Sequence, residues 1–244
     1  MIRIGCAGWS LPRAVQQAFG EGGSHLQRYA TRLNAAEINS SFHRPHARSL
    51  YERWADSVPA DFRFSAKLPK TITHERRLVD CEGELHAFLG QVAGLGTRLA
   101  CLLVQLPPSL AFDADIAARF LETLRNTCGD TALAMEPRHA SWFTDEADGL
   151  LQRMQVARVL ADPVRHAPGQ WPGGWPQRVY LRLHGSPRMY YSSYPPEQLQ
   201  AVAHRMRQAS DAGQEVWCIF DNTASGAAAD NALALLRALY QEQT

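Results

Sequence analysis

Two segments decide how this chain folds: Ala36-Glu37-Ile38-Asn39-Ser40 and Phe62-Arg63-Phe64-Ser65-Ala66-Lys67. In a strand, successive side chains point to opposite faces, so Glu37 and Asn39 share one face of the first segment. Ser65 and Lys67 share one face of the second segment in the same way. Later apolar runs also close on polar residues, namely Gln105, Glu136, Asp162, His184 and Asp221. Parallel strands that each present a polar group at the carboxyl end describe the mouth of a (β/α)8 barrel, where active sites of that architecture lie.

The order of the apolar runs predicts the rest of this barrel. Eight strands are expected, at residues 2–6, 35–40, 62–67, 99–106, 131–136, 156–161, 178–184 and 215–221. Helical periodicity is clearest at Ile116, Phe120 and Leu124 after the capping candidate Asp113, at Leu199, Val202 and Met206 after Pro195-Pro196, and at Leu233, Leu236 and Tyr240. Such alternation requires parallel pairing with right-handed crossovers. Eight units with a final helix favour an α/β fold closed as a (β/α)8 TIM barrel over an open doubly wound sheet. The 244 residues fit a single domain, residues 1–244.

One interval departs from the alternation. Residues 163–176 contain four prolines and three glycines and lack a helical period. We therefore expect a loop in place of the helix after strand six. Its aromatic residues Trp171 and Trp175 would either form a lid over the barrel or cover an exposed helix face, and we favour the covering role.

Composition restricts the classes of function. A formal net charge of +1 is no global signature of a nucleic-acid or membrane binder, so any anion site must be local. The apolar run at residues 99–106 is too short to span a bilayer, and the chain opens into a strand without a leader, so we expect a cytoplasmic protein. The five cysteines lack CxxC spacing, which argues against a disulfide framework and a thiolate zinc site.

Lysine usage singles out one strand end. Of the 25 basic residues only Lys67 and Lys70 are lysines, and the other 23 are arginines. An ammonium differs from a guanidinium in hydration, titration and reach, so Lys67 is a candidate for a function that arginine could not serve. The alternative explanation is that genome composition favours arginine and that the two lysines lie beside one strand end by chance.

The catalytic candidates are the ionisable residues of the predicted mouth: Glu37, Lys67, Glu136 and His184. Burying so many charges costs several kcal/mol for each unpaired one, so they must pair, contact water or bind a ligand. Glu37 and Glu136 would be the acid/base pair, and Lys67 an electrostatic stabiliser or an imine-forming amine. The structural alternative is a plug of ion pairs, for instance Glu37 with Lys67 and Glu136 with Arg182.

Polar and aromatic residues at or beyond the strand ends are the ligand-binding candidates. Imidazole and guanidinium groups suit a phosphate or carboxylate, and the helix start after Asp221 offers backbone N–H groups to an anion. The set is Trp9, Asn39, His43, Arg44, His74, Gln105, Arg138, His139, Asp162, Arg182, Asp221 and Asn222. No HxH or HExxH spacing is present, so we assign no metal ligands, and the residues imply no cofactor strongly enough to name one.

Several motifs along the chain resemble those of one known family. They are Gly5-Cys6-Ala7-Gly8-Trp9-Ser10, Glu37-Ile38-Asn39-Ser40-Ser41-Phe42, Phe64-Ser65-Ala66-Lys67-Leu68-Pro69, Thr73-His74-Glu75-Arg76-Arg77-Leu78, Gln105-Leu106-Pro107-Pro108-Ser109, Arg138-His139, Ser141-Trp142, Arg182-Leu183-His184-Gly185 and Asp221-Asn222. Together they resemble the YecE-like family, domain of unknown function 72. The resemblance implies a TIM-type barrel without an agreed activity. The chain departs from the family where Asp221-Asn222 replaces Asn-Asn and Cys6-Ala7 replaces a Thr-Ser pair.

Three functions follow as hypotheses. The first is a protein that binds a small anionic ligand, such as a phosphate ester or sugar acid, at the mouth, and whose acid/base candidates would suit a lyase, isomerase or hydrolase. The second is a metal-dependent nucleic-acid phosphodiesterase similar to endonuclease IV, with a basic rim of Arg44, Arg48, Arg76, Arg77 and Arg138. The third is a non-catalytic barrel plugged by ion pairs. Nucleic acid is thus a partner only in the second, no membrane partner is expected, and the oligomeric state is left open.

Overall fold

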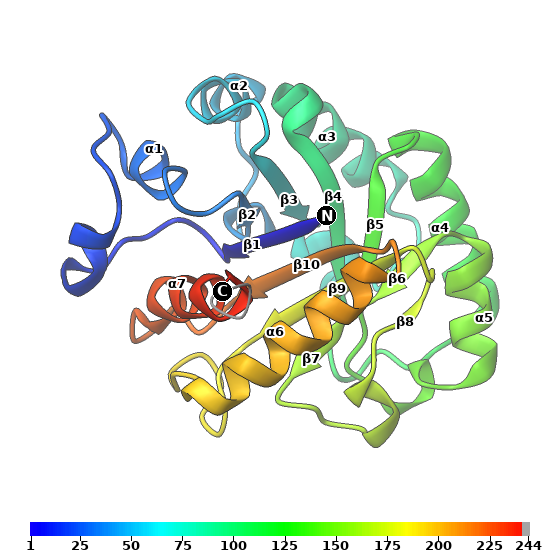
Figure 1. The fold of residues 1–244 in the computed structure, drawn as a ribbon. Helices are drawn as coiled ribbons and strands as arrows, with labels where there is room; N and C mark the ends of the chain where they lie inside the picture. Colours follow the sequence, from blue (N-terminus) through cyan, green and yellow to red (C-terminus); the bar gives the residue numbers. More distant parts are fainter. Residues whose placement is uncertain (241–244) are drawn as a thin grey trace.

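The computed structural model describes residues 1–240. Its strands form two hydrogen-bonded sheets, each of which we call a ladder (Figure 1). One ladder has the order β1-β10-β9-β7 and the other β2-β3-β4-β5-β6-β8. The strands are β1 (Ile2–Cys6), β2 (Ala35–Ile38), β3 (Arg63–Lys67), β4 (Leu99–Gln105), β5 (Ala132–Glu136), β6 (Val156–Arg158), β7 (Leu160–Asp162), β8 (Gly173–Gly174), β9 (Arg178–Leu183) and β10 (Glu215–Phe220). All pairs are parallel except that of β6 with β8.

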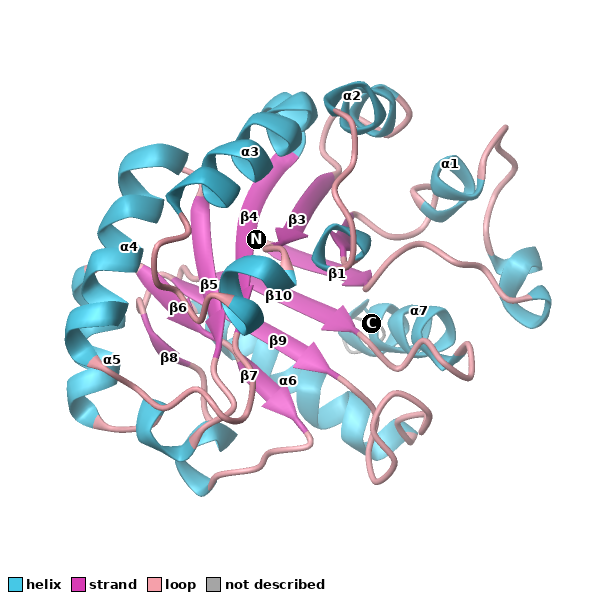
Figure 2. Cartoon of the chain, turned by 180° about the vertical axis from the view of Figure 1, so that it is seen from behind, coloured by secondary structure: helices cyan, strands magenta, loops and turns pink. Residues whose placement is uncertain are grey.

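The two ladders join into one closed barrel (Figure 2). The predicted sixth strand is present as β6 and β7, which are separated at Val159; β6 pairs with β5, and β7 pairs with β9. At the other seam Ala7 bridges to Glu37, and the Gly8 N–H donates to the Glu37 carbonyl at 2.8 Å. The eight strand positions therefore follow one another around the barrel in sequence order. The predicted TIM barrel is confirmed.

Side chains complete the seam between β1 and β2. The Tyr29 hydroxyl accepts from the Cys6 N–H at 2.7 Å and donates to the Ala35 carbonyl at 2.8 Å. The Asn34 amide accepts from the Ile4 N–H at 2.9 Å and donates to the Ile2 carbonyl at 3.0 Å. These contacts satisfy backbone groups that a continuous ladder would otherwise pair.

The helices form the outer ring of the barrel (Figure 1). They are α1 (His25–Tyr29), α2 (Arg48–Asp56), α3 (Glu82–Val92), α4 (Ala114–Cys128), α5 (Asp145–Arg153), α6 (Pro196–Asp211) and α7 (Ala227–Tyr240). Short 3₁₀ turns lie at Arg13–Ala18, Ser40–Phe42, Ala93–Arg98, Ala140–Trp142 and Ala167–Gln170, and a π turn lies at Thr71–Glu75. The capping prediction is confirmed, because Asp113 accepts from the Ile116 N–H at 3.0 Å. Among residues 1–240, no helix combines the length and apolarity needed to cross a bilayer.

The loop after the sixth strand replaces a helix, as predicted. It contains one 3₁₀ turn and the short strand β8, which pairs antiparallel with β6. Gly174 has a φ of +66°, and a Cβ there would collide with the Val156 carbonyl, so the position requires glycine. Trp171 stays 58% exposed and lies under the Arg205 guanidinium of α6, at 4.7 Å. Trp171 therefore packs on a helix and forms no lid.

The barrel interior is layered. The amino-terminal part is apolar: the rings of Tyr180 and Trp217 stack there at 5.8 Å, among small side chains such as Ala35, Cys101 and Ala134. Further along the same strands the interior becomes polar, with Glu37, Glu136 and Arg182 two positions on beside the apolar Leu103 and Ile219, and His184 and Asp221 four positions on. The strand pattern thus concentrates charge at the carboxyl end of the barrel.

Candidate functional site

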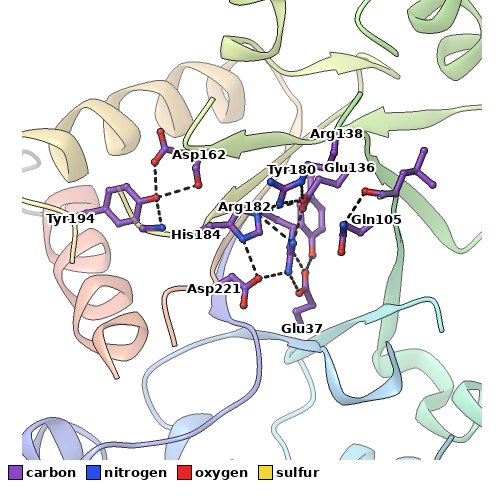
Figure 3. A network of polar contacts seen from close by, with 12 residues as sticks. Glu37, Gln105, Glu136, Arg138, Asp162, Tyr180, Arg182, His184, Tyr194 and Asp221 are labelled. Carbon is purple, nitrogen blue, oxygen red and sulfur yellow. Dashed lines mark hydrogen bonds and ion pairs between the residues drawn. The ribbon is translucent and has the colours of Figure 1, made fainter. Parts of the chain in front are cut away.

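Arg182 is the centre of a buried ion-pair network (Figure 3). It lies on β9 and is 1% exposed. Its Nε and Nη2 donate to the two carboxylate oxygens of Glu37, at 3.0 and 2.6 Å. Its Nη1 donates to Glu136 Oε2 at 2.6 Å, and Nη2 also reaches Asp221 Oδ2 at 2.9 Å. One guanidinium therefore joins carboxylates from β2, from β5 and from the end of β10.

A second arginine completes the binding of Glu136. Arg138 lies just beyond β5, is 8% exposed, and its Nε donates to Glu136 Oε1 at 2.6 Å. Its Nη2 also contacts Glu136 and lies 2.8 Å from His184 Nε2. Both oxygens of Glu136 are therefore held by guanidinium groups.

The contacts of His184 define its tautomer. Arg138 and Arg182 approach Nε2 at 2.8 and 3.4 Å, and a guanidinium can only donate. His184 Nε2 must therefore be the acceptor, which places the proton on Nδ1. Nδ1 lies 3.1 Å from Asp221 Oδ2, although the angle is outside hydrogen-bond geometry. The imidazole therefore lies between the two arginines at Nε2 and the Asp221 carboxylate on the side of Nδ1.

The network fixes the charge of its carboxylates. Burial would raise the pKa of Glu136, but the charges of Arg182 and Arg138 hold that pKa well below its usual range. The pKa of Asp221 is lowered in the same way, with Arg182 again outweighing burial. Both groups are therefore ionised at neutral pH.

Lys67 behaves differently from the arginines. It ends β3, is 6% exposed, and its Nζ lies 4.0 Å from the centroid of the Phe42 ring. Within residues 1–240, this nitrogen makes no hydrogen bond or ion pair. Burial and then the Arg182 charge lower the pKa of Lys67 to about 8, against the opposing effect of Glu37, Glu136 and Asp221. A buried amine without an ionic partner lies at the mouth.

One of the two ion pairs that the sequence suggested for a plug is observed. Glu136 pairs with Arg182, as expected. Glu37 does not pair with Lys67, because Arg182 already occupies both of its oxygens. A guanidinium fork matches a carboxylate in two places and an ammonium does not, which explains the preference.

Four other candidates from the strand ends lie outside the network. Asp162 accepts from the Tyr194 hydroxyl at 2.6 Å, and Gln105 donates to the Leu106 carbonyl at 3.0 Å. Asn222 donates to the Ser192 carbonyl and to Asn231 Oδ1, at 2.9 and 2.8 Å. The Oδ1 atoms of Asn222 and Asn39 are buried without a partner among the described residues.

The candidates from the loops are dispersed. Trp9 packs against Trp54 at 5.0 Å, and the His139 side chain contacts Ser141 at 2.9 Å. His74 and His43 meet the Phe42 ring edge to face, at 4.9 and 5.0 Å, while Arg44 is exposed. Burial and the nearby Lys67 lower the pKa of His74.

Four residues that contact the site are absent from the predicted candidates. Tyr180 donates to Glu37 at 3.1 Å and contacts the Ser65 hydroxyl at 2.7 Å. The period-two pattern places Ser65 on the face of Lys67, and it could also have found Tyr180, which precedes Arg182 by two residues. Phe42 beneath Lys67 and Tyr190, edge-on to His184 at 5.7 Å, come from loops and leave no such signal.

Over residues 1–240, no three His, Cys, Asp or Glu side chains are grouped so that they could hold a metal ion. The acidic groups of the mouth are bound by arginines instead.

Comparison with known proteins identifies the family. The chain is 31% identical to the UPF0759 protein YecE of Escherichia coli K12 over 170 residues, which cover 66% of this chain but only 59% of that relative. It is 22% identical to the UPF0759 protein YunF of Bacillus subtilis 168, over 98% of this chain and 95% of that one. A crystal structure of a DUF72 family protein from Enterococcus faecalis V583 superimposes with a TM-score of 0.81 at 24% identity, covering 98% of this chain and 95% of that one. The family model described as protein of unknown function DUF72 matches residues 3–244, and the chain therefore belongs to the DUF72 family, as its YecE-like motifs predict.

Proposed function

We propose that the mouth of the barrel binds a small anionic ligand that carries a carbonyl group, such as a sugar phosphate or a sugar acid, and that Lys67 is its anchor. The observation that carries the proposal is the state of Lys67: a buried amine at the end of β3, without an ionic partner and with a pKa of about 8. A buried cation that has no ionic partner in the protein is available to bind an anionic group of a ligand.

The neighbouring charges support this role. Arg182 and Arg138 occupy the oxygens of Glu37 and Glu136, so these carboxylates do not compete for the amine. In its ammonium form Lys67 would hold a phosphate or carboxylate electrostatically. The bound anion would in turn raise the pKa of Lys67.

The same amine can react with a carbonyl. With a pKa near 8, roughly a tenth of Lys67 is the free amine at pH 7. Its nitrogen would bond to the carbonyl carbon, and the carbonyl oxygen would leave as water with the two amine hydrogens, giving an imine. His184, whose Nε2 accepts from Arg138, would serve as a proton carrier. Glu136 is ionised and doubly ion-paired, so its role in this proposal is to orient Arg138 and Arg182 and not to donate a proton.

A trapping experiment tests the proposal. The protein is incubated with single sugar phosphates, sugar acids and 2-oxo acids and with cyanoborohydride, which reduces an imine to a stable secondary amine. Intact-mass and peptide analysis should find the adduct on Lys67, and a melting-temperature screen should find a ligand that stabilises the fold. Lys67→Arg should lose the adduct and Lys70→Arg, at the other lysine, should keep it. Equal labelling in Lys67→Arg, or no ligand in either assay, would remove Lys67 from this role.

The ion-pair plug is the second candidate, and one observation favours it. Three carboxylates, Glu37, Glu136 and Asp221, face three cations, Arg138, Arg182 and Lys67, so the mouth is formally neutral without a ligand. This candidate predicts that no small anion raises the melting temperature. The trapping and melting experiments therefore separate the two.

The nucleic-acid hypothesis ranks third because most of its expected rim is already engaged. Arg138 lies inside the network, Arg48 pairs with Glu52 at 3.0 Å, and Arg76 pairs with Glu84 at 2.6 Å. A phosphate backbone is bound through arginines that are free to replace its counterions.

A further inference from the structure

A cavity of about 210 Å³ lies next to the mouth, on the outer side of the strand ends. It is open to solvent on one side and is bordered by the turn Ser40–Phe42, by the start of the turn Thr71–Glu75 and by α3. Its walls include Phe42, Arg44, Pro45, Pro69, Ala87 and Phe88. Phe42 also carries the Lys67 amine on its ring, so the cavity and the mouth share one aromatic side chain.

The walls of this cavity are mostly apolar. Phe88 comes from the buried face of α3, and two prolines and Phe42 also line the cavity. A cavity of about 150 Å³ with apolar walls is already large enough to bind benzene. The cavity beside Phe42 therefore has room for one ring and a small polar group.

The charges around the cavity are balanced except for one. Lys70 pairs with Glu75 at 3.0 Å, and Glu84 pairs with Arg76 at 2.6 Å. The Arg44 guanidinium makes no ion pair or hydrogen bond with any of residues 1–240. The edge of an apolar cavity thus carries a single uncompensated positive charge.

We propose that this cavity is a binding site for a monocarboxylate with an apolar body of about one ring. The ring would lie between Phe42 and Phe88, and the carboxylate would accept hydrogen bonds from Arg44. A single free guanidinium suits a monoanion and neutralises only half of a phosphate dianion. This site does not depend on the role proposed for Lys67, because its walls and its charge come from other residues.

The two lysines allow the site to be tested directly. Reductive methylation with ¹³C-formaldehyde labels Lys67 and Lys70 and the terminal amine, and Lys70→Arg assigns the Lys70 signal. Lys70 lines the cavity, whereas Lys67 lies at the mouth. Benzoate should move the Lys70 signal saturably, and neutral benzamide, of the same shape, should bind more weakly.

Matched arginine variants complete the test. Arg44→Gln should lower the affinity for benzoate about fivefold. Hydrogen bonds between charged groups are strong, but the exposure of Arg44 to water reduces the loss. Arg53→Gln removes an exposed arginine of α2 that does not line the cavity, and it should leave benzoate binding unchanged. The proposal is overturned by the absence of a saturable Lys70 shift, by equal affinity in Arg44→Gln, or by a shift of the Lys67 signal only. The last result would place the carboxylate at the mouth and would favour the function proposed for Lys67.

Discussion

Arg182 holds three carboxylates at once because a guanidinium presents five N–H donors in a planar fork. Two donors point to Glu37, one to Glu136 and one to Asp221. Removing such a residue from a buried network leaves several charges uncompensated. Lys67 lacks this geometry, and its amine is stabilised only by an aromatic ring and by more distant charges. At the scale of single residues, the mouth therefore contains ion-paired arginines and one lysine whose ammonium form is disfavoured by burial.

The free-energy cost of burying the Lys67 side chain depends on pH. Burial first, and then Arg182, lower its pKa from 10.5 to about 8, so the folded protein disfavours the ammonium form. Below pH 8 Lys67 is protonated in both the folded and the unfolded protein, and the full cost is present. Between pH 8 and 10.5 the unfolded chain binds more protons, so the contribution of Lys67 to stability rises with pH. The shift corresponds to a cost of about 3 kcal/mol at neutral pH.

Lys67→Met should therefore raise the free energy of unfolding at pH 7 by about 3 kcal/mol or somewhat less. The difference between this variant and the original protein should shrink as the pH rises from 8 to 10.5. Denaturant unfolding at several pH values measures it, and taking the difference cancels the titration of tyrosines and cysteines. A difference that stays constant over this range would contradict the lowered pKa. A residue kept at a cost to stability is more readily explained by function than by structure.

At the scale of elements, the seam between β1 and β2 depends on side chains. Tyr29 is fully buried, and its hydroxyl joins the Cys6 N–H to the Ala35 carbonyl. Tyr29→Phe would leave both backbone groups buried and unpaired, and we expect it to lower the free energy of unfolding by about 3 kcal/mol. Chemical denaturation measures this loss.

Tyr51 provides the matched control for Tyr29. It is equally buried, but its hydroxyl has no hydrogen-bond partner among the described residues. Tyr51→Phe should therefore change stability by less than about 1 kcal/mol, or increase it. Equal losses in the two variants would show that the seam does not depend on the Tyr29 hydroxyl.

The same elements explain what could be predicted from the sequence. A period of two depends only on the strand itself, so it placed Glu37, Lys67, Glu136 and His184 in one interior. The break of the sixth strand at Val159 and the Tyr29 and Asn34 contacts at the seam arise from closing the barrel, which no single segment encodes. Ion-pair partners also depend on positions across the barrel. For that reason the sequence predicts the pair of Arg182 with Glu136, but not that Arg182 also binds Glu37 and Asp221.

At the scale of the whole molecule, Arg182 joins the two ladders. Arg182 and Asp221 belong to the ladder that contains β9 and β10, whereas Glu37 and Glu136 belong to the ladder that contains β2 and β5. Among residues 1–240, the backbone contacts between the ladders are the Ala7 to Glu37 bridge with its Gly8 hydrogen bond, and the junction of β6 and β7. Ion pairs through the barrel interior add to these few contacts, and they should make unfolding more cooperative.

Arg182→Met tests this connection. Breaking a buried ion-pair network costs about 3 to 5 kcal/mol, and loss of the link between the ladders should also broaden the unfolding transition and lower its apparent m-value. Arg178→Met is the control, because Arg178 lies on the same strand and pairs with Glu215 at 2.6 Å, but both belong to one ladder and are 19% and 29% exposed. The control should lose about 1 kcal/mol with an unchanged m-value. Circular dichroism and tryptophan fluorescence, the latter including the buried Trp217, should give one midpoint in the original protein and separate midpoints in Arg182→Met. Coincident curves and an unchanged m-value in Arg182→Met would mean that the barrel backbone alone makes the two ladders unfold together.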